Sequence, residues 1–327
     1  MILRECRPLR EHYRKLDRIE EGTYGIVYRA EDLHTGEIVA LKQLKLEKER
    51  EGFPVTSLRE ISAMMRMEDH PNIVRLREIV VGRDNGCEQI YMVLDYVDHD
   101  LRTLLDERLG HSNGPFSMAE TKSLLKQLLT GVAAMHERWL VHRDIKTTNI
   151  LVSKDGVLRI ADFGLARLVG SHNYNANEEN EGKGNLTPLV VTLWYRAPEL
   201  LLGATSYGPP VDVWSVGCVF GELLLGNPLF PGKGEVDQFQ KICDLLGRPS
   251  PELWPNMKKL PDYGKLAEPL KCKDLNKLWT KLPRLNQSGF DLINSMLFFD
   301  PLQRISAQDA LNHPFFLETP YPETPKL

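Results

Sequence analysis

The sequence predicts an α+β fold made of two lobes, a small β-rich lobe followed by a larger helical lobe. Between residues 13 and 96, short apolar runs alternate with glycine-bearing turns, a pattern typical of strands. From residue 101 onward, apolar residues recur at helical spacing instead. We therefore expect one domain over residues 13–317, divided into an N-lobe (13–96) and a C-lobe (97–317), between an N-terminal extension (1–12) and a Pro-rich tail (318–327).

The N-lobe should contain a small sheet and one main helix. Apolar residues at helical spacing between Leu58 and Met65 predict a helix that begins near Thr56 or Ser57. The hinge between the lobes is expected at residues 95–97. Apolar runs bounded by turn residues predict strands near residues 13–19, 26–28, 38–42, 73–81 and 90–96.

The C-lobe should be mainly helical. Ser117 and Glu120 have the Ser-x-x-Glu spacing of a capping box, which predicts the start of a helix with an apolar stripe. Residues 211–225 are apolar nearly all round, as expected of a helix buried in the middle of a lobe. Two further helices are expected over residues 288–298 and 306–311.

The composition is that of an ordinary soluble globular protein, with 42% hydrophobic residues, 26% charged residues and a net charge of −4. No basic surplus indicates nucleic-acid binding, and no apolar run of about 18 residues indicates a membrane span. The first residues contain no apolar core of the length a signal peptide needs. The five cysteines are scattered and never spaced as CxxC, so a reducing compartment is expected rather than a disulfide or zinc scaffold.

The strongest chemical signal is the loop of residues 141–149, which carries Asp144, Lys146 and Asn149 and is followed by Asp162. A phosphoryl-transfer site needs a carboxylate that accepts the proton of the attacking hydroxyl, a cation beside the transferred phosphate, and an amide and a second carboxylate that bind Mg2+. An isolated aspartate would usually cap a turn, so the assignment of Asp144 as the base depends on these neighbours. The apolar runs on either side of an Asp-Gly turn at residues 155–156 predict a hairpin that holds Asp162 against the loop.

Lys42 ends the apolar run of a predicted strand, and Glu60 lies on the predicted helix that follows. Two interpretations of Glu60 are open. It can pair with Lys42 and hold the lysine over nucleotide phosphates, or it can close a capping box that begins at Ser57. We favour the ion pair and note that the two interpretations could describe two states of one helix.

A glycine-bearing loop, Glu21-Gly22-Thr23-Tyr24-Gly25, joins the first two predicted strands. Glycines allow a backbone to approach phosphates closely. Glu20 stands where the first glycine of a GxGxxG loop would be. Its carboxylate would either add negative charge near the nucleotide or point to solvent. We expect a modest weakening of ATP binding.

These motifs resemble those of cyclin-dependent protein kinases, in the PITSLRE/PISSLRE-like subgroup, over residues 13–317. The resemblance is carried by the glycine loop, the strand ending at Lys42, and five further stretches: Pro54-Val55-Thr56-Ser57-Leu58-Arg59-Glu60, His142-Arg143-Asp144, Lys146-Thr147-Thr148-Asn149, Asp162-Phe163-Gly164-Leu165-Ala166-Arg167 and Val191-Thr192-Leu193-Trp194-Tyr195-Arg196-Ala197-Pro198-Glu199. It implies a bilobal protein kinase fold with ATP and Mg2+ as cofactors. It also implies transfer of the γ-phosphoryl group to Ser or Thr followed by Pro.

The resemblance implies further nucleotide-site residues and one more catalytic residue. Leu94 takes the gatekeeper position, where its small non-aromatic side chain departs from the Phe common in the family. Thr192 joins Asp144, Lys146, Asn149 and Asp162 as a catalytic residue. The nucleotide site implied in this way consists of Ile19, Glu20, Glu21, Gly22, Thr23, Tyr24, Gly25, Ile26, Val27, Ala40, Lys42, Glu60, Leu94, Asp95, Tyr96, Val97, Asp100 and Leu151.

Regulation is also implied by the resemblance. A cyclin would dock on residues 54–60 and push Glu60 towards Lys42. Thr187 matches the activating phosphorylation site, which a separate activating kinase would modify, and Thr23 and Tyr24 match inhibitory sites. The phosphate on Thr187 would be received by three arginines, which are Arg59, Arg143 and Arg167.

Other positions match structural features of the family. Glu199 and Arg304 match a buried ion pair, and Asp212 matches a helix-start anchor beneath the catalytic loop. Val191 and Arg196 match the pocket that prefers proline after the target residue. The relatives imply a nuclear location, with the cytoplasm as a second one, and a role in transcription, RNA processing or the cell cycle.

Residues 170–185 form a polar Asn-, Gly- and Glu-rich stretch that looks like an insertion in the activation segment. A disordered surface loop is the simplest interpretation, and such a loop would make activity depend strongly on Thr187 phosphorylation. Two rival functions remain open at this point. One is a catalytically inactive scaffold that binds a cyclin, and the other is a kinase of a neighbouring family that uses no cyclin.

Overall fold

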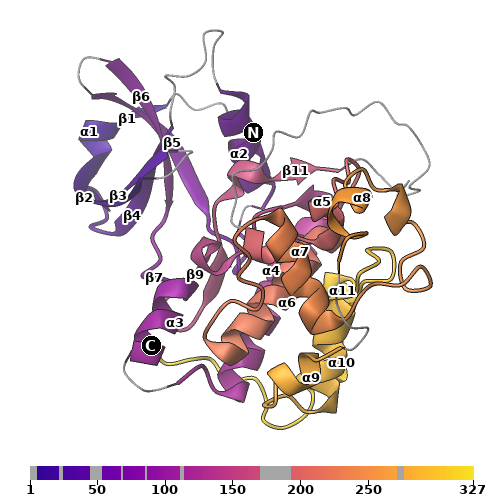
Figure 1. The fold of residues 1–327 in the computed structure, drawn as a ribbon. Helices are drawn as coiled ribbons and strands as arrows, with labels where there is room; N and C mark the ends of the chain where they lie inside the picture. Colours follow the sequence, from indigo (N-terminus) through magenta and orange to yellow (C-terminus); the bar gives the residue numbers. More distant parts are fainter. Residues whose placement is uncertain are drawn as a thin grey trace.

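The computed structural model describes residues 6–21, 25–44, 54–67, 69–84, 87–110, 114–169, 193–270 and 276–327. The chain forms a β-rich N-lobe and a larger helical C-lobe (Figure 1). This is the α+β arrangement that the sequence predicts. The crossing from one lobe to the other follows the strand that ends at Asp95.

The N-lobe is built on a six-stranded sheet with the strand order β1-β5-β6-β4-β3-β2. All neighbouring pairs are antiparallel except β1 and β5, which are parallel. The strands are β1 (Arg7–Pro8), β2 (Tyr13–Glu21), β3 (Gly25–Asp32), β4 (Ile38–Leu44), β5 (Leu76–Asp84) and β6 (Cys87–Asp95). The predicted strands near 13–19, 26–28, 38–42 and 90–96 are present in this sheet, and the one expected from residue 73 begins at Leu76.

Residues 7–12 are part of the N-lobe rather than a separate extension in space. Arg7 in β1 lies opposite Val80 of β5, and α1 (Leu9–His12) follows it directly. Leu9 is buried in the apolar cluster of the sheet, together with Tyr13. The Arg7 guanidinium also donates from Nε to Glu78 Oε2 at 2.9 Å. These contacts are made with a strand some 70 residues later in the chain, so no local sequence pattern predicts them.

The helix α2 (Val55–Arg66) packs its inner face toward the C-lobe. Ala63 and Met64 belong to the same contiguous apolar cluster as the helices of the C-lobe. The sheet has a separate apolar cluster of its own. This helix therefore links the two lobes.

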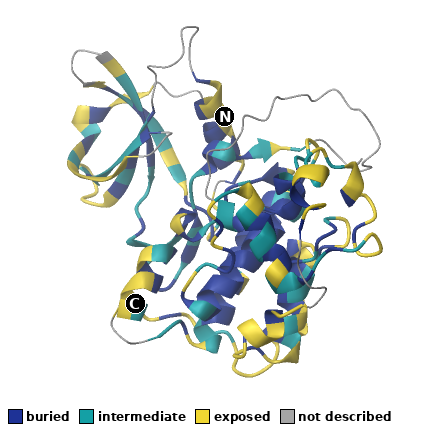
Figure 2. Cartoon of the chain, viewed as in Figure 1, coloured by how far each residue is buried: buried dark blue, intermediate teal, exposed yellow. Residues whose placement is uncertain are grey.

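The C-lobe is organised around α4 (Met118–Glu137) and α6 (Pro210–Leu225), which are largely buried (Figure 2). The predicted capping box is present: Ser117 Oγ accepts from Glu120 N at 3.2 Å, and Glu120 Oε2 accepts from Ser117 N at 2.8 Å. The remaining helices are α3 (Leu101–Gly110), α5 (Pro198–Leu201), α7 (Glu235–Leu246), α8 (Tyr263–Leu266), α9 (Leu278–Lys281), α10 (Gln287–Met296) and α11 (Ala307–Leu311).

Short strands and single helical turns lie between these helices and carry most of the site. Two small sheets are formed, with the strand orders β10-β9-β7 and β11-β8. The strands are β7 (His99–Asp100), β8 (Leu140–Val141), β9 (Ile150–Val152), β10 (Leu158–Ile160) and β11 (Arg167–Leu168). The 3-10 turns near the site are η1 (Thr147–Asn149), η2 (Phe163–Leu165) and η3 (Leu193–Tyr195).

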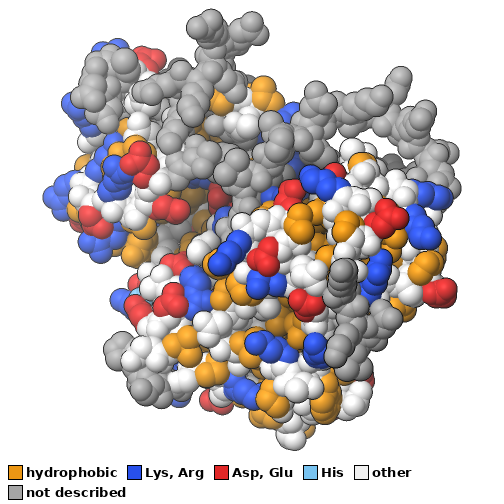
Figure 3. Space-filling model, viewed as in Figure 1, with side chains coloured by type: hydrophobic (Ala, Val, Ile, Leu, Met, Phe, Trp, Pro, Cys, Tyr) orange, Lys and Arg blue, Asp and Glu red, His pale blue; other side chains and the backbone are white. Residues whose placement is uncertain are grey.

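The tail after residue 317 has no helix or strand and lies along the first half of α4. Lys122 Nζ donates to the carbonyl of Glu318 at 2.7 Å, and Glu323 N donates to the carbonyl of Ala119 at 3.0 Å. On the face drawn in Figure 3, basic and acidic side chains are interspersed. Among the described residues, no helix has the length and apolar character needed to cross a bilayer.

Candidate active site

The catalytic loop connects β8 to β9, and the hairpin β9–β10 returns the chain to the same place. Ile150 lies opposite Ile160 in this hairpin, and Ala161 N donates to the carbonyl of Asn149 at 2.9 Å. Asp162 follows directly. The hairpin therefore holds the amide of Asn149 and the carboxylate of Asp162 at a fixed separation, which is the arrangement expected from the Asp-Gly turn.

The Asp144 carboxylate is 6% exposed and contacts two other residues of the loop. Its Oδ2 accepts from Lys146 Nζ at 2.8 Å and from Asn149 Nδ2 at 2.9 Å. Asn149 Nδ2 also donates to the carbonyl of Asp144 at 2.9 Å. The three side chains therefore meet at one oxygen. The second oxygen, Oδ1, takes no part in these bonds and can accept from a substrate hydroxyl.

The shape of the loop is supported from below by Asp212, which begins α6. The backbone N–H groups of His142 and Arg143 each donate to its carboxylate at 2.8 Å. Arg143 has φ +73°, a left-handed conformation that is uncommon for a non-glycine residue. Burial alone would raise the pKa of Asp212, but the hydrogen bond with His136 and the N–H of Arg143 help to hold it below its usual value. Asp212 is thus the anchor that the resemblance implies.

His142 bridges the loop and the segment that carries Asp162. Its Nδ1 accepts from Asp144 N at 3.3 Å, which leaves Nε2 to donate to the carbonyl of Ala161 at 3.0 Å. This pattern corresponds to the neutral imidazole with its proton on Nε2. The ring also packs edge-on against Phe163, with 5.0 Å between ring centroids.

Lys42 brings the N-lobe to this site. Its Nζ lies 2.5 Å from Glu60 Oε1 on α2 and 3.0 Å from Asp162 Oδ1 in the C-lobe. Burial alone would lower the pKa of Lys42, but the two carboxylates outweigh it and hold the pKa above its usual value. The lysine is therefore charged, and the single chain already contains this ion pair.

The capping-box interpretation of Glu60 is wrong. The helix begins at Val55 with Pro54 as its N-cap, and no side chain caps it. Ser57 is therefore the third residue of the helix, one turn too late to cap it, and the Glu60 carboxylate reaches Lys42 instead. The predicted helix start at Thr56 or Ser57 was late by one or two residues.

Asn149 and Asp162 form a donor set that fits Mg2+. The two hydrogen bonds of the Asn149 side chain are both made by Nδ2, which leaves its amide oxygen as a ligand. Although burial alone would raise the pKa of Asp162, the Lys42 ammonium lowers it below its usual value, so the group is an anion. An amide oxygen and a carboxylate are the hard ligands that this ion prefers. ATP phosphates would supply further oxygens.

The apolar residues expected around the nucleotide base come from both lobes. Ala40 on β4 lies opposite Leu94 on β6, and Leu151 of the C-lobe is half-buried, as are Ile26 and Val27 on β3. Ile19 is 50% exposed. Between the lobes, Tyr96 and Val97 directly follow β6.

Two carboxylates of this expected set have other partners in the structure. Asp95 Oδ1 accepts from Arg77 Nε at 2.6 Å. Asp100 accepts from the backbone N and the hydroxyl of Thr103, at 2.9 and 2.6 Å, and so caps the start of α3. Asp100 therefore has a structural role in addition to the expected contact with ATP.

The glycine loop lies only partly within the described residues. Gly22, Thr23 and Tyr24 lie outside them, as do Val191, Thr192, Thr187 and residues 170–185. Glu20 and Glu21 are exposed at the end of β2, and a register shift separates Arg18 from Glu20 in the pairing with β3. A Cβ on Gly25 would lie 2.3 Å from the carbonyl oxygen of Gln43. This glycine is thus required by close packing of β3 on β4.

Arg59 of α2 lies close to Arg143 and Arg167, and the three form a cluster of positive charges. The pKa of Arg167 lies below its usual value because of burial and the nearby positive charges of the other two arginines. Nη1 of Arg143 and Nη1 of Arg167 are buried and have no hydrogen-bond partner among the described residues. Three neighbouring cations, two of them with an unsatisfied buried donor, have the chemistry to bind an anion.

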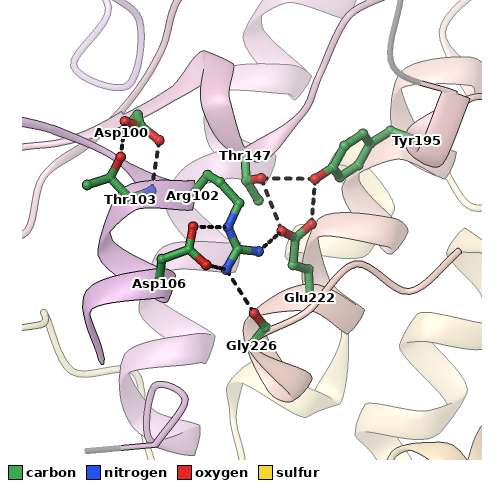
Figure 4. A network of polar contacts seen from close by, with 8 residues as sticks. All are labelled: Asp100, Arg102, Thr103, Asp106, Thr147, Tyr195, Glu222 and Gly226. Atoms are coloured by element: carbon green, nitrogen blue, oxygen red, sulfur yellow. Dashed lines mark hydrogen bonds and ion pairs between the residues drawn. The ribbon is translucent and has the colours of Figure 1, made fainter. Parts of the chain in front are cut away.

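The predicted ion pair between Glu199 and Arg304 is present in the C-lobe. Arg304 Nη1 and Nη2 donate to the two Glu199 oxygens at 2.8 and 3.0 Å. Sequence reasoning missed another buried carboxylate, Glu222, which lies near the end of α6 and contacts Thr147 and Tyr195 (Figure 4). A charged residue within an otherwise apolar run was the signal available for it.

Comparison with known proteins agrees with this geometry. Residues 13–316 match the family described as protein kinase domain. The chain is 50% identical over 326 residues to cyclin-dependent kinase 11B of Homo sapiens, covering 99% of this chain and 38% of the relative. It is 46% identical over 332 residues to serine/threonine-protein kinase PITSLRE of Drosophila melanogaster, covering 98% of this chain and 33% of that protein.

A fission-yeast relative, serine/threonine-protein kinase ppk23 of Schizosaccharomyces pombe, is 46% identical over 326 residues, which are 99% of this chain and 77% of that protein. The chain thus spans about two-fifths or less of the human and fly relatives. The resemblance drawn from the motifs is confirmed over nearly the whole chain. The chain belongs to the protein kinase domain family.

Proposed function

We propose that this protein is a cyclin-dependent serine/threonine kinase that transfers the γ-phosphoryl group of ATP to Ser or Thr followed by Pro. The observation that carries the proposal is the meeting of two lobes at one point, where Lys42 contacts both Glu60 and Asp162. Asp144 and Lys146 lie on the adjoining loop. A buried lysine shared by two carboxylates, next to a loop that carries an aspartate, a lysine and an asparagine, is typical of a phosphoryl-transfer site.

The residues have distinct roles in the proposed transfer. Asp144 accepts a hydrogen bond from the substrate hydroxyl and orients it. It takes the hydroxyl proton as the new oxygen–phosphorus bond forms and the bond from the γ-phosphorus to the bridging oxygen of ADP breaks, so that ADP leaves. Lys146, which contacts the same carboxylate, places a positive charge beside the phosphoryl group in transit. Lys42 holds the non-transferred phosphates. Magnesium bound by Asn149 and Asp162 supplies charge neutralisation.

Docking of a cyclin on α2 is supported by its outer face. Val55, Leu58 and Met65 are 50%, 51% and 44% exposed, and they recur at helical spacing. The inner face of the same helix carries Glu60. A partner that covers the apolar face would hold Glu60 against Lys42, which links partner binding to activity.

Activation by phosphorylation of Thr187 is supported by the arginine cluster. A phosphothreonine carries about two negative charges and would supply acceptors for the unpartnered nitrogens of Arg143 and Arg167. We expect a Thr187→Ala variant to lose most of its partner-dependent activity. Equal activity of this variant and the parent protein would contradict the proposed role of Thr187.

Preference for proline after the target residue is proposed from the family match and from Arg196. This side chain is largely buried beside Glu235, at 3.2 Å, and lies close enough to Asp144 for the carboxylate to influence its pKa. From the family match alone, we propose that the protein acts in the nucleus, in transcription, RNA processing or the cell cycle.

The decisive experiment is transfer of radiolabelled phosphate from ATP to a Ser-Pro peptide. The full chain is expressed in a eukaryotic cell and purified with whatever protein binds it, and Asp144→Asn serves as the control. We expect a cyclin-fold partner in the complex and incorporation that Asp144→Asn abolishes. Binding of a cyclin without turnover would indicate an inactive scaffold, and turnover by the chain alone would indicate a kinase that needs no cyclin.

A further inference from the structure

Glu222 is a buried carboxylate that the roles described so far leave without a function. It lies near the end of α6, and its side chain is 0% exposed. Its Oε2 accepts from the hydroxyl of Tyr195 at 2.6 Å, and its Oε1 accepts from Thr147 Oγ1 at 3.2 Å. Thr147 Oγ1 and the Tyr195 hydroxyl are themselves 2.9 Å apart, so the three side chains form a closed triangle (Figure 4).

The charge of Glu222 is balanced by Arg102 of α3. Arg102 Nη1 lies 2.5 Å from Glu222 Oε1, and its Nη2 donates to the carbonyl of Gly226 at 3.0 Å. The opposite edge of the guanidinium pairs with Asp106, which is exposed (Figure 4). Because a buried ion is stable only when paired and hydrogen-bonded, this set of contacts indicates a charged carboxylate held in a defined position.

The triangle joins two segments whose relative position must stay fixed for the reaction. Thr147 directly follows Lys146 and opens the turn that contains Asn149. Tyr195 ends the turn η3 and precedes Arg196, on the side of the site where a peptide substrate is proposed to bind. The backbone carbonyl of Tyr195 also accepts from Ser215 Oγ of α6 at 2.8 Å. The same helix thus holds Tyr195 at both its backbone and its hydroxyl.

The two carboxylates of α6 support different halves of the catalytic loop. Asp212, at the start of the helix, binds the backbone of His142 and Arg143. Glu222 lies ten residues further, about 15 Å along the helix axis. Through Thr147 it reaches the half of the loop that carries Lys146 and Asn149.

We propose that Glu222 is a positioning residue for phosphoryl transfer, which fixes Thr147 of the catalytic loop to Tyr195 of the substrate-side segment. The inference rests on the proposed kinase activity and adds a specific role for three residues that do not touch the nucleotide or the metal. Displacement of a catalytic group by about 1 Å can lower a rate by about a hundredfold. A network that prevents such displacement acts on kcat more than on nucleotide binding.

The test compares Thr147→Val, Tyr195→Phe and Glu222→Gln in the full chain, purified with its partner. Thr147→Val removes one hydroxyl with almost no change in volume, so it should fold even if Glu222→Gln does not. Thr147→Ser restores the hydroxyl. Thr130→Val is the matched control, because the Thr130 hydroxyl donates within α4, to the carbonyl of Lys126, and takes no part in the triangle. kcat, the KM values for ATP and peptide, and the fraction of nucleotide-binding protein are measured.

We expect Thr147→Val to lower kcat about tenfold or more per nucleotide-binding site, with the KM for ATP within about twofold of the parent value. Thr147→Ser and the Thr130→Val control should stay within about threefold in kcat. Thr147→Val and Tyr195→Phe should combine less than additively, because each breaks the same triangle.

A parent protein that transfers phosphate, together with a Thr147→Val variant of equal kcat, would overturn the positioning role and leave the proposed function intact. A reduced nucleotide-binding fraction with unchanged kcat per site would also overturn it, because that is the signature of a purely structural network. A parent protein that transfers no phosphate would overturn both proposals.

Discussion

Two buried ion pairs, one in the C-lobe and one between the lobes, are built in different ways. In the first, Arg304 binds both oxygens of Glu199 and also donates to the carbonyls of Pro210, Phe298 and Phe299. Its guanidinium lies 5.2 Å from the centre of the Trp214 ring. In the second, Lys42 makes one short contact with Glu60 and one with Asp162.

The difference follows from what each pair has to do. The planar guanidinium of an arginine satisfies several acceptors in a rigid arrangement, which suits a permanent structural link. A lysine ammonium is a point charge on a flexible stem, so Lys42 can exchange partners when a nucleotide arrives or when α2 moves. The first pair therefore supports the fold, and the second is suited to a site that is assembled and taken apart.

The largest effect is expected when the second pair is broken. Lys42→Met should lower kcat/KM by about 10²–10³-fold or more, because a fixed cation at the phosphates is lost. The buried Glu60 carboxylate also loses its partner, so the free energy of unfolding should fall as well. Peptide phosphorylation and thermal unfolding measure the two quantities, and Lys154→Met, at a lysine with a 73% exposed side chain, is the matched control. Kinase activity of Lys42→Met close to that of the parent would contradict the assignment.

Breaking the first pair should affect stability instead. Arg304→Met leaves the Glu199 carboxylate buried and unpaired, and the expected loss in the free energy of unfolding is about 3–5 kcal/mol. Arg304→Lys keeps a charge and should lose less. Arg29→Met breaks an exposed pair with Asp17 and should cost at most about 1 kcal/mol. Urea denaturation tests the series, and equal losses for Arg304→Met and Arg29→Met would show that burial does not matter here.

A smaller contrast is expected between two glycines. Gly25→Ala places a methyl group against the Gln43 carbonyl, and overpacking of this kind costs about 1–3 kcal/mol. Gly110→Ala meets no atom of the described residues within 4 Å and should be neutral or slightly stabilising. The free energies of unfolding of the two variants can be compared directly. A Gly25→Ala protein as stable as its parent would mean that the two strands can separate without loss.

The smallest expected effect concerns the exposed charge at the entrance to the nucleotide site. Glu20→Gly should lower the KM for ATP by less than about fivefold, because an interaction between exposed charges is worth up to about 1 kcal/mol. The effect should weaken at high salt, as screening requires. If the KM for ATP does not change at low salt, Glu20 points to solvent and has no influence on binding.

Several parts of the fold follow from patterns that are local in the chain. The Asp-Gly turn predicts the hairpin β9–β10, Ser117 and Glu120 predict the start of α4, and the apolar run over 211–225 predicts the buried helix α6. The catalytic loop can also be predicted from the sequence, because its functional groups lie within nine residues and a single hairpin returns Asp162 to it. In these cases the contacts that matter are made between neighbours in sequence.

Other features were decided only by contacts between distant segments. One example is the pairing of β1 with β5, which depends on where β5 lies. In the same way, Glu60 contacts Lys42 rather than capping its helix, and Asp100 caps α3, because of where the neighbouring segments lie. The network of Glu222 joins residues up to 124 positions apart. The sequence by itself determined which chemical groups are present and the elements that carry them. Only the tertiary structure decided which charges meet, because the energy of a buried charge depends on the partners that folding brings to it.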